Sequence, residues 1–509
     1  MADQLDIALV RTRHGYAEER LWHRFLVDSY TGGGGFAGRI GSPESELGSI
    51  ATVYPPCEGS YLDRYPREDV LKFARRVKIA HYVNYIEPLT DLKCGLALAK
   101  PYTIENLPVK VLEWRGNVDG LGTSFAVARS RLVRRAALVG WAPVLVDMPL
   151  SSYGVETQAQ AQAAGLSPRL VPLYPGNLTE WHFSDGSLEW VKVRNDFCER
   201  ESFDGDESKY SIVDVWQTDS VRSFRLVDRK VASADEIPRS GPIPLTVLRH
   251  KEAEDDPMIG LPMNGQVAIE ARRLFNLMSA LDEALDASCF PLLVMVDSLD
   301  PNSDAPDGGG EVTIGAGNAI TLPKDATKQH YYLAPPSEVF DAFEKRIEET
   351  VREMYRQGRV EFVRPAGSQN ESGIARKYAF QQTNTAIGSF AQQIAAWEQD
   401  TYRVVARLLG VPDADIEQIR VIPPDEFDVD DIEAALKQAE LAFAAKLGPT
   451  FNATLRKRLA QEILPNVSDD VRATIDDEID AEETDAASVA AFTAQTPIDP
   501  FANQQPPTM

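Results

Sequence analysis

Two segments with helical periodicity, 266–290 and 337–358, lie in the middle of the chain on either side of a turn-rich insert. Apolar residues recur in each segment at spacings of three and four, and charged residues fill most of the other positions, as in helices that bury one face. At about 1.5 Å per residue the second helix is about 33 Å long. The apolar stripes are Leu274, Leu277, Met278 and Leu281 in the first helix and Phe340, Phe343, Ile347 and Val351 in the second. This pair of long helices around an insert constrains the fold more than any other feature.

A polar stretch, 359–373, separates the second helix from the longest helical pattern of the chain, 374–409. The stretch is rich in turn residues, and it contains no metal-ligand cluster, no nucleophile beside a base and no phosphate-binding motif. In the pattern that follows, apolar residues such as Ile387, Ile394 and Trp397 repeat close to a heptad. A continuous helix there would be about 54 Å long.

Residues 61–265 mix helical patterns with strands. Pro66 is predicted to open a helix that has Glu68 in its first turn, where an acidic side chain complements the helix dipole. Alternating apolar and polar residues further on predict an antiparallel meander. The alternation covers 188–194, 210–218 and 223–230, and the insert 291–336 holds two or three further short strands.

The two ends of the chain have weaker patterns. Residues 1–60 indicate a loosely organised arm, with a short helix candidate at 21–30 before a glycine-rich linker. Helical patterns return at 428–483. The last residues, 484–509, are rich in Ala, Thr, Gln and Pro and are predicted to be disordered.

Composition excludes several classes of protein. The chain of 509 residues has a net charge of −25, and from Val411 onward it holds 21 acidic but only 7 basic residues. A protein that coats DNA is basic, because neutralised phosphates supply most of its affinity. The sequence has no signal-peptide core and no apolar run of membrane length, and its four separated cysteines fit a reducing cytoplasm. We therefore expect a protein that is neither exported nor membrane-spanning.

Catalytic motifs are missing from the sequence. The six histidines have no H-x-x-x-H spacing, and no G-x-S-x-G or Walker A sequence occurs. The acidic helix faces are interpreted as solvated or subunit-facing rather than as a two-metal nuclease site, so no enzyme, cofactor or metal site is expected. The densest basic cluster is interpreted as a solvated face or an intersubunit salt-bridge surface, with DNA contact as the alternative. Its members are Arg129, Arg131, Arg134 and Arg135.

Three stretches, together with the order of the elements, resemble the portal proteins, or head–tail connectors, of tailed bacteriophages. The stretches are YLDRYPREDVLKFARRVKIAHYVNYIEPLTDLKCGLALAKP (61–101), NVDGLGTSFAVARSRLVRRAALVGWAPVLVDMP (117–149) and SGIARKYAFQQTNTAIGSFAQQIAAWEQ (372–399). The resemblance implies an α+β, mainly helical, portal-like fold that assembles as a ring, usually of twelve copies. The glycine-rich linker and the acidic tail show no family pattern.

By the same resemblance the chain divides into the regions of a portal subunit. These are an N-terminal arm and linker (1–60), a wing of helices and antiparallel strands (61–265), a first stem helix (266–290), a clip (291–336), a second stem helix (337–358), a tunnel loop (359–373), a long wing helix with its connection (374–427), a crown (428–483) and a disordered tail (484–509). The apolar stripes of the two stem helices would be the packing surfaces of the stem.

The tunnel loop and the start of the next helix carry the candidate DNA-facing residues. They are Arg359, Arg364, Ser368, Gln369, Asn370, Arg376 and Lys377. A ring of positive side chains at a constriction could grip DNA transiently. The alternative is that these cations pair with Glu361 and Glu371 inside the subunit.

The function implied by the resemblance is a conduit for double-stranded DNA during packaging and ejection, at one vertex of a virion capsid. The implied partners are further copies of the chain, double-stranded DNA bound without sequence preference, the terminase large subunit, the major capsid and scaffold proteins and a head–tail adaptor. Assembly would take place in the host bacterial cytoplasm. Two other hypotheses stay open, which are another oligomeric virion protein, such as a minor head protein, and a metal-dependent nuclease.

Overall fold

The computed structural model divides the chain into two compact units, one of Met1–Leu98 with Thr103–Pro423 and one of Ala99–Tyr102 with Pro424–Met509. The structure describes residues 2–36, 60–148, 160, 166–200, 203, 207–289, 292–296, 319–322, 331–333, 338–360, 373–424, 449–463, 471 and 474–481. Helices and four sheets together confirm a mixed α+β fold.

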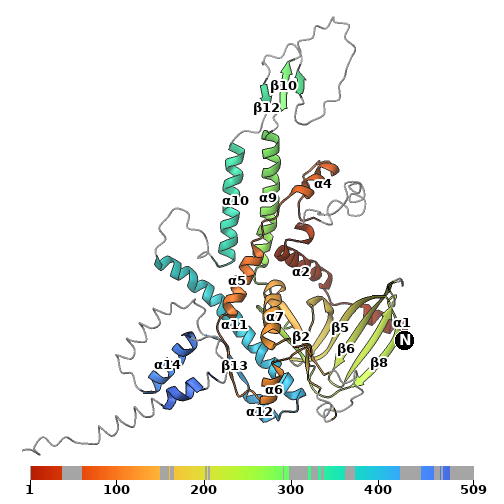
Figure 1. Ribbon diagram of the computed structural model, residues 1–509. Coiled ribbons are helices and arrows are strands. Elements are labelled where there is room, and N and C mark those ends of the chain that lie inside the picture. The colour runs from red at the N-terminus through yellow and green to blue at the C-terminus, as the bar shows by residue number, and fades with distance from the viewer. Residues whose placement is uncertain are drawn as a thin grey trace, which may run out of the picture. The chain divides into compact units, whose positions relative to one another are not determined.

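Helices hold more of the described residues of the larger unit than strands do (Figure 1). They are α1 (Ala2–Val10), α2 (Tyr16–Thr31), α4 (Val70–Ile79), α5 (Ile86–Leu98), α6 (Val109–Trp114), α7 (Phe125–Val139), α9 (Gly265–Cys289), α10 (Glu338–Gln357), α11 (Gly373–Leu408) and α12 (Asp413–Gln418), with the short 3-10 helices η1 (Gly34–Phe36) and η4 (Pro175–Asn177). The three longest, α9, α10 and α11, match the helices expected at 266–290, 337–358 and 374–409 to within one residue at each end.

The strands are short except in one meander. They are β1 (Thr103–Glu105), β2 (Trp141–Asp147), β3 (Arg169–Pro172), β4 (Leu178–Ser184), β5 (Ser187–Arg200), β6 (Glu207–Gln217), β7 (Ser220–Val227), β8 (Lys230–Pro238), β9 (Leu245–Arg249), β10 (Leu292–Val296), β11 (Ala319–Leu322), β12 (Tyr331–Leu333) and β13 (Arg420–Ile422). The expected meander is a five-stranded antiparallel sheet in the order β4-β5-β6-β7-β8.

A smaller antiparallel sheet, β3-β2-β9, lies against this meander. Alternation along the strands places Val191 and Val193 of β5 on one face, where they pack with Trp141 and Leu145 of β2 in a buried cluster. Helix α11 packs along β9, and the indole of its Trp397 donates a hydrogen bond of 3.2 Å to the Thr246 hydroxyl. The long helix therefore belongs to the core of this unit.

The N-terminal segment is better ordered than the sequence predicts. The helix expected at 21–30 is confirmed as part of α2, but the expected loose organisation is wrong for residues 2–31, because α1 and α2 both pack onto the unit. Leu9 of α1 is buried against the meander, and the Lys192 ammonium donates hydrogen bonds to the carbonyl oxygens of Ala8 (2.9 Å) and Arg11 (2.5 Å). A cation at a helix C-terminus complements the helix dipole, so a strand residue holds this helix in place.

Helix α4 begins later than predicted. Pro66 does not open it, because Arg67 adopts a left-handed φ of 65°, which interrupts a continuous helix. Asp69 is the N-cap instead, and its carboxylate accepts hydrogen bonds from the backbone N–H of Leu71 (2.8 Å) and Lys72 (3.3 Å). Glu68 is consequently outside the helix and available for another contact.

The basic cluster on α7 is used largely inside the chain. Arg129 pairs with the buried carboxylate of Glu398 at 2.7 Å, and Arg134 pairs with Asp91 at 3.0 Å. Arg135 donates to the Leu173 carbonyl at 3.0 Å. The interpretation as a solvated or intersubunit surface is therefore wrong for Arg129 and Arg135, which tie α7 to its neighbours, whereas Arg134 stays exposed to solvent beside Asp91.

The smaller unit contains α14 (Pro449–Ile463) and a helical stretch at 474–481. Lys457 and Asp480 form an ion pair of 2.7 Å between them. The other parts of the predicted crown, and the tail 484–509, lie outside the described residues.

Candidate stem and loop root

Helices α9 and α10 run side by side in opposite chain directions (Figure 1). With 25 and 20 residues they are about 37 Å and 30 Å long. The described part of the connection between them is a three-stranded sheet, in which β10 pairs parallel with β11 and antiparallel with β12. Because β10 starts at Leu292 and β12 ends at Leu333, this sheet caps the far ends of both helices.

The seam between the helices is most tightly packed near their shared base. Leu274 is buried there with Ala271 of α9 and Met354 of α10, and Ile347 and Val351 pack against them. The same cluster includes core residues of α2 and α5, namely Leu26, Ile86 and Leu89. The helix pair is therefore anchored in the core of the larger unit at this end.

Farther from the base the predicted stripe is only partly covered. The predicted stem residues that remain half-buried there are Leu277, Leu281, Phe340 and Phe343, and Met278 is half-buried while it packs against the basal cluster. Leu285, one turn beyond Leu281, is 43% exposed. These side chains keep apolar area that a single copy does not bury.

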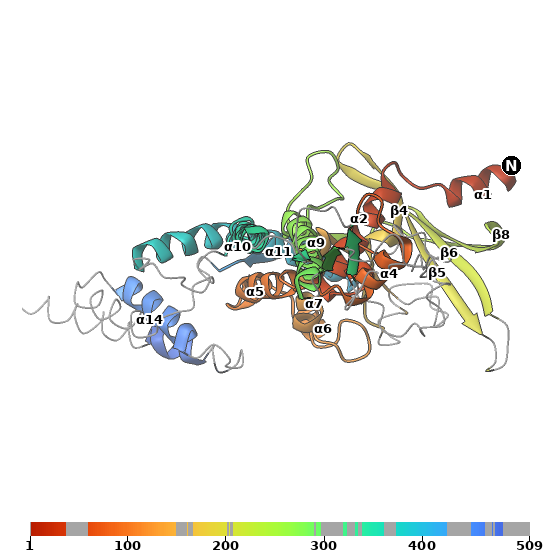
Figure 2. The same cartoon turned by 90° about the horizontal axis from the view of Figure 1, so that it is seen from above.

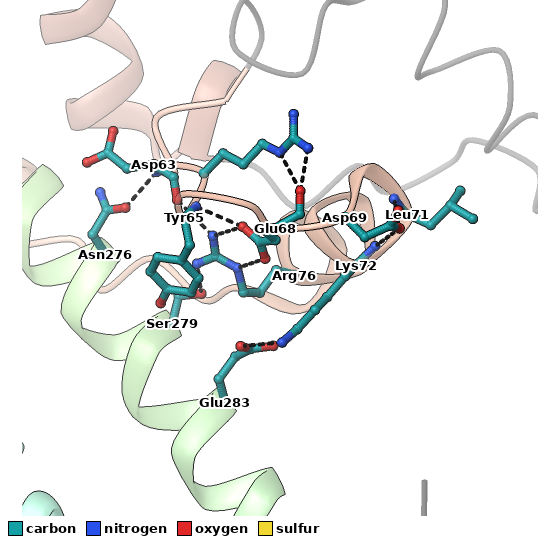
Figure 3. Close-up of polar contacts among 11 residues, drawn as sticks. Asp63, Tyr65, Glu68, Asp69, Leu71, Lys72, Arg76, Asn276, Ser279 and Glu283 are labelled. Carbon is teal, nitrogen blue, oxygen red and sulfur yellow. Dashed lines mark hydrogen bonds and ion pairs between the residues drawn. The ribbon is translucent and has the colours of Figure 1, made fainter. Parts of the chain in front are cut away.

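The opposite face of α9 is polar and carries a network that the sequence did not reveal (Figure 3). Arg272 pairs with Asp63 at 2.7 Å, and the Asn276 side-chain oxygen accepts from the backbone N–H of Asp63 at 2.7 Å. Two turns beyond Asn276, Glu283 pairs with Lys72 of α4 at 3.1 Å. The segment containing α4 is thereby fastened along α9.

A buried ion pair lies at the centre of this network. The Arg76 guanidinium donates to both carboxylate oxygens of Glu68, at 2.8 Å and 2.9 Å, and both side chains are only 2% exposed. Its Nη1 donates to the Ser279 hydroxyl (3.2 Å), and Nη2, which also bonds Glu68, donates to the Asp63 carbonyl (2.7 Å). Burial alone would raise the pKa of Glu68, but the hydrogen bonds from Arg76 and from the Tyr65 backbone lower the pKa of this carboxyl below its ordinary value.

The chain leaves α10 through a fixed turn, which we call the loop root (Gly358–Val360). Val360 is fully buried in the basal cluster, and its N–H donates to the Tyr355 carbonyl at 3.1 Å. Arg359 has a left-handed φ of 54°, and its carbonyl accepts a hydrogen bond from the Thr383 hydroxyl of α11. The start of the polar stretch is therefore held against both flanking helices.

Of the predicted DNA-facing residues, only Arg359 has a described side chain, which is exposed at the loop root. Arg364, Ser368, Gln369 and Asn370 lie outside the described residues, as do Glu361 and Glu371. Arg376 and Lys377 belong to the first turns of α11, but their side chains are also outside the described set. Their predicted roles stay predictions.

A buried lysine near the loop root was missed by sequence reasoning. The Lys93 ammonium of α5 donates to the Asn264 side-chain oxygen at 2.7 Å, and the Asn264 amide donates to the Thr90 hydroxyl at 2.8 Å. Burial, followed by the nearby charge of Arg359, lowers the pKa of Lys93 to about 8. The sequence did indicate this burial, because Lys93 lies four residues from both Leu89 and Ala97, on the buried face of the same helix.

The lowered pKa of Lys93 predicts a stability that rises with pH. An unfolded lysine with the ordinary pKa of 10.5 keeps a proton that folded Lys93 releases near pH 8, so the unfolded state binds more protons between these values. We expect the free energy of unfolding to rise by about 2 kcal/mol between about pH 7.5 and 9.5. Lys93→Met should remove this rise, whereas Lys209→Met, at an exposed strand position, should keep it. Urea denaturation at both pH values measures the difference, and an equal rise in both variants would contradict the assignment.

No family model and no curated protein matches this sequence. A solved chain described as the neck of an empty GTA particle, computed with C6 symmetry, is similar in structure with a TM-score of 0.40 and 12% sequence identity. The similarity covers 75% of this chain and 90% of that chain. A likeness at this level assigns no family. The site must therefore be interpreted from its own geometry.

Within the described residues, no three His, Cys, Asp or Glu side chains gather in a way that could hold a metal ion. Among the helices of the described ranges, none combines the length and apolar character needed to cross a bilayer.

Proposed function

We propose that this chain is a portal protein, which forms a ring at one vertex of a phage capsid and conducts double-stranded DNA during packaging and ejection. The observation that carries the proposal is the order of parts around the loop root. Two long antiparallel helices meet a small sheet at one end, and a polar segment leaves their anchored end directly before a 36-residue helix. A ring subunit needs this combination, because a rigid stem must project from the core and a loop must leave it at a fixed point.

In this assignment α9 and α10 are the stem, and the half-buried apolar side chains far from the base are covered by neighbouring copies. The sheet of β10, β11 and β12 belongs to the clip, where the terminase large subunit and later a head–tail adaptor dock. The major capsid and scaffold proteins surround the ring in the virion. Residues 361–372 with the loop root are the tunnel loop, and twelve copies complete the ring.

The acidic composition fits a DNA conduit. Each copy has a net charge of −25, so a channel wall lined by part of this charge repels the phosphates of DNA and keeps the duplex from adhering. At physiological ionic strength such repulsion extends only about 8 Å. It therefore acts at close range and leaves room for Arg359 to contact DNA at a constriction.

Deletion of residues 361–372 tests the proposal. Electron microscopy of the purified wild-type chain should show rings with a central opening. The deletion variant should form rings of the same size but lose packaged DNA in a packaging assay with its terminase, because the loop contacts the moving duplex and the stem does not depend on it. A variant that lacks the last twelve residues, 498–509, is the matched control and should still package.

Three results would contradict this function. A chain that stays monomeric at every concentration contradicts the ring, and a deletion variant that cannot assemble shows that the segment is structural. Magnesium-dependent cleavage of plasmid DNA by the pure wild-type chain would favour a nuclease instead.

A further inference from the structure

Helix α9 is the middle helix of a three-helix layer. Leu274 points into the seam with α10, whereas Glu283, nine residues later, pairs with α4. At about 100° per residue these two side chains point in opposite directions. Figures 1 and 2 both show α9 between α10 and α4. The polar face of α9 and the basal part of its apolar face are thus covered within the chain, and α4 and α10 form the two flanks of the layer.

The outer face of α4 is basic and apolar. Leu71 and Ile79 are 62% and 51% exposed, although both are large apolar residues. Arg75 and Lys78 are exposed beside them, Lys72 is paired with Glu283 of α9, and α4 contains no acidic residue. A surface of this kind fits an acidic partner that also covers apolar area.

One flank of α10 is rich in acidic residues. Asp341, Glu344 and Glu348 are exposed, and their spacings of three and four place them on one flank, with the exposed Lys345 and Arg352 at its edge. Within the described part of the chain no ion pair reaches these three carboxylates, whereas Glu349 and Glu353 pair with arginines of the same helix.

We propose that the outer face of α4 in one copy docks on the acidic flank of α10 in a second copy. The inference rests on the proposed ring and names its contact. Arg75 and Lys78 of the first copy would face the three carboxylates of the second. Burial of Leu71 and Ile79 contributes affinity, and the charges set the register.

The arrangement suits a closed ring. The two faces differ and lie at opposite ends of the layer, so one copy uses both of them at the same time. Such a heterologous contact joins copies head to tail and closes when the rotation per copy divides a full turn. Duplex DNA would satisfy the basic face of α4 but would leave the acidic flank of α10 without a partner, so a second copy accounts for both surfaces.

Charge reversal tests the contact with two variants. Arg75→Glu/Lys78→Glu makes α4 acidic, and Glu344→Lys/Glu348→Lys makes the α10 flank basic. Each variant alone should lose association between copies in mass photometry, because like charges then face each other. A mixture of the two variants should associate again as alternating copies, and a chain that carries all four changes should also associate. Lys209→Glu/Lys230→Glu on the meander, a change of equal charge, should associate like the wild type.

Circular dichroism spectra and melting temperatures equal to those of the wild type show that each variant is folded. Association in the mixture gives a second control, because it is recovered without any new substitution. Rings that form in each variant alone would contradict the proposed contact and support the proposed ring. Open oligomers that follow the predicted charge pattern would support the contact and contradict the ring. Absence of association in every sample, wild type included, overturns both. Loss of duplex DNA binding in the α4 variant with its rings intact assigns this face to DNA and overturns the contact.

Discussion

Gly140→Ala should lower the free energy of unfolding of the larger unit by about 3 kcal/mol, the combined effect of a left-handed residue and an overpacked contact. Gly140 ends α7 with a φ of 103°, and an added Cβ would overlap the backbone carbonyl of Gly260. Backbone cannot move aside as a flexible side chain can. The two glycines therefore allow a contact that no other pair of residues permits.

The contact matters because it sets the start of the stem. The N–H of Met263 donates to the Ala137 carbonyl at 2.8 Å, two residues before α9 begins. A side chain at Gly140 pushes this segment away from α7, so the base of α9 shifts with it. We therefore expect ring assembly as well as stability to suffer.

Chemical denaturation of the variant measures the first effect and electron microscopy the second. Gly95→Ala is the matched control, because an added Cβ at Gly95 in α5 meets no atom within 4 Å. That substitution should stabilise the chain by about 0.5–1 kcal/mol through helix propensity alone. Equal effects at the two positions would disprove the close backbone contact.

Arg76→Leu should cost at least about 3 kcal/mol, because it leaves the buried carboxylate of Glu68 without its cation. The double variant Glu68→Leu/Arg76→Leu should recover much of this loss, since no charge then remains buried. Arg24→Leu removes a 3.9 Å pair whose arginine is 73% exposed, and it should change stability by less than about 1 kcal/mol. A loss in the double variant as large as in Arg76→Leu would show that packing, not charge, dominates here.

The same pair predicts a response to acid. Because the folded pKa of Glu68 lies below its ordinary value of 4.5, its contribution to stability is fully present above that value and is lost as pH falls through the folded pKa. The double variant should lose less stability than the wild type over this window in urea titrations at decreasing pH.

The long helices were predictable from sequence because their signal is local. Periodic apolar residues predicted α9, α10 and α11 to within one residue. Alternation predicted the three central strands of the meander, β5, β6 and β7, but not the outer strands β4 and β8. The start of α4 was mispredicted because a proline followed by acidic residues also fits a turn, and the left-handed Arg67 decides between the two.

What sequence could not supply were contacts between distant residues. Glu68 resembled an ordinary acid of a first helical turn, and only the approach of Ser279 on α9 encloses its pair with Arg76. Lys93 and Asn264 are far apart in the chain, so nothing local predicts that one buried group satisfies the other. In the candidate site, the sequence predicted the apolar stripes of α9 and α10 but not the polar contacts that join α9 to the segment containing α4.

The pairing of β1 with β13 has a consequence for the order of synthesis. Ile104 lies opposite Val421, so the ends of this two-stranded sheet are separated by nearly the whole larger unit. At about 5–20 residues per second a ribosome needs roughly 15–60 s to travel between them. During that time the emerging N-terminal half lacks β13 and α11, which packs along β9 and α5. The larger unit of a nascent chain thus stays incomplete until almost all of it has been translated.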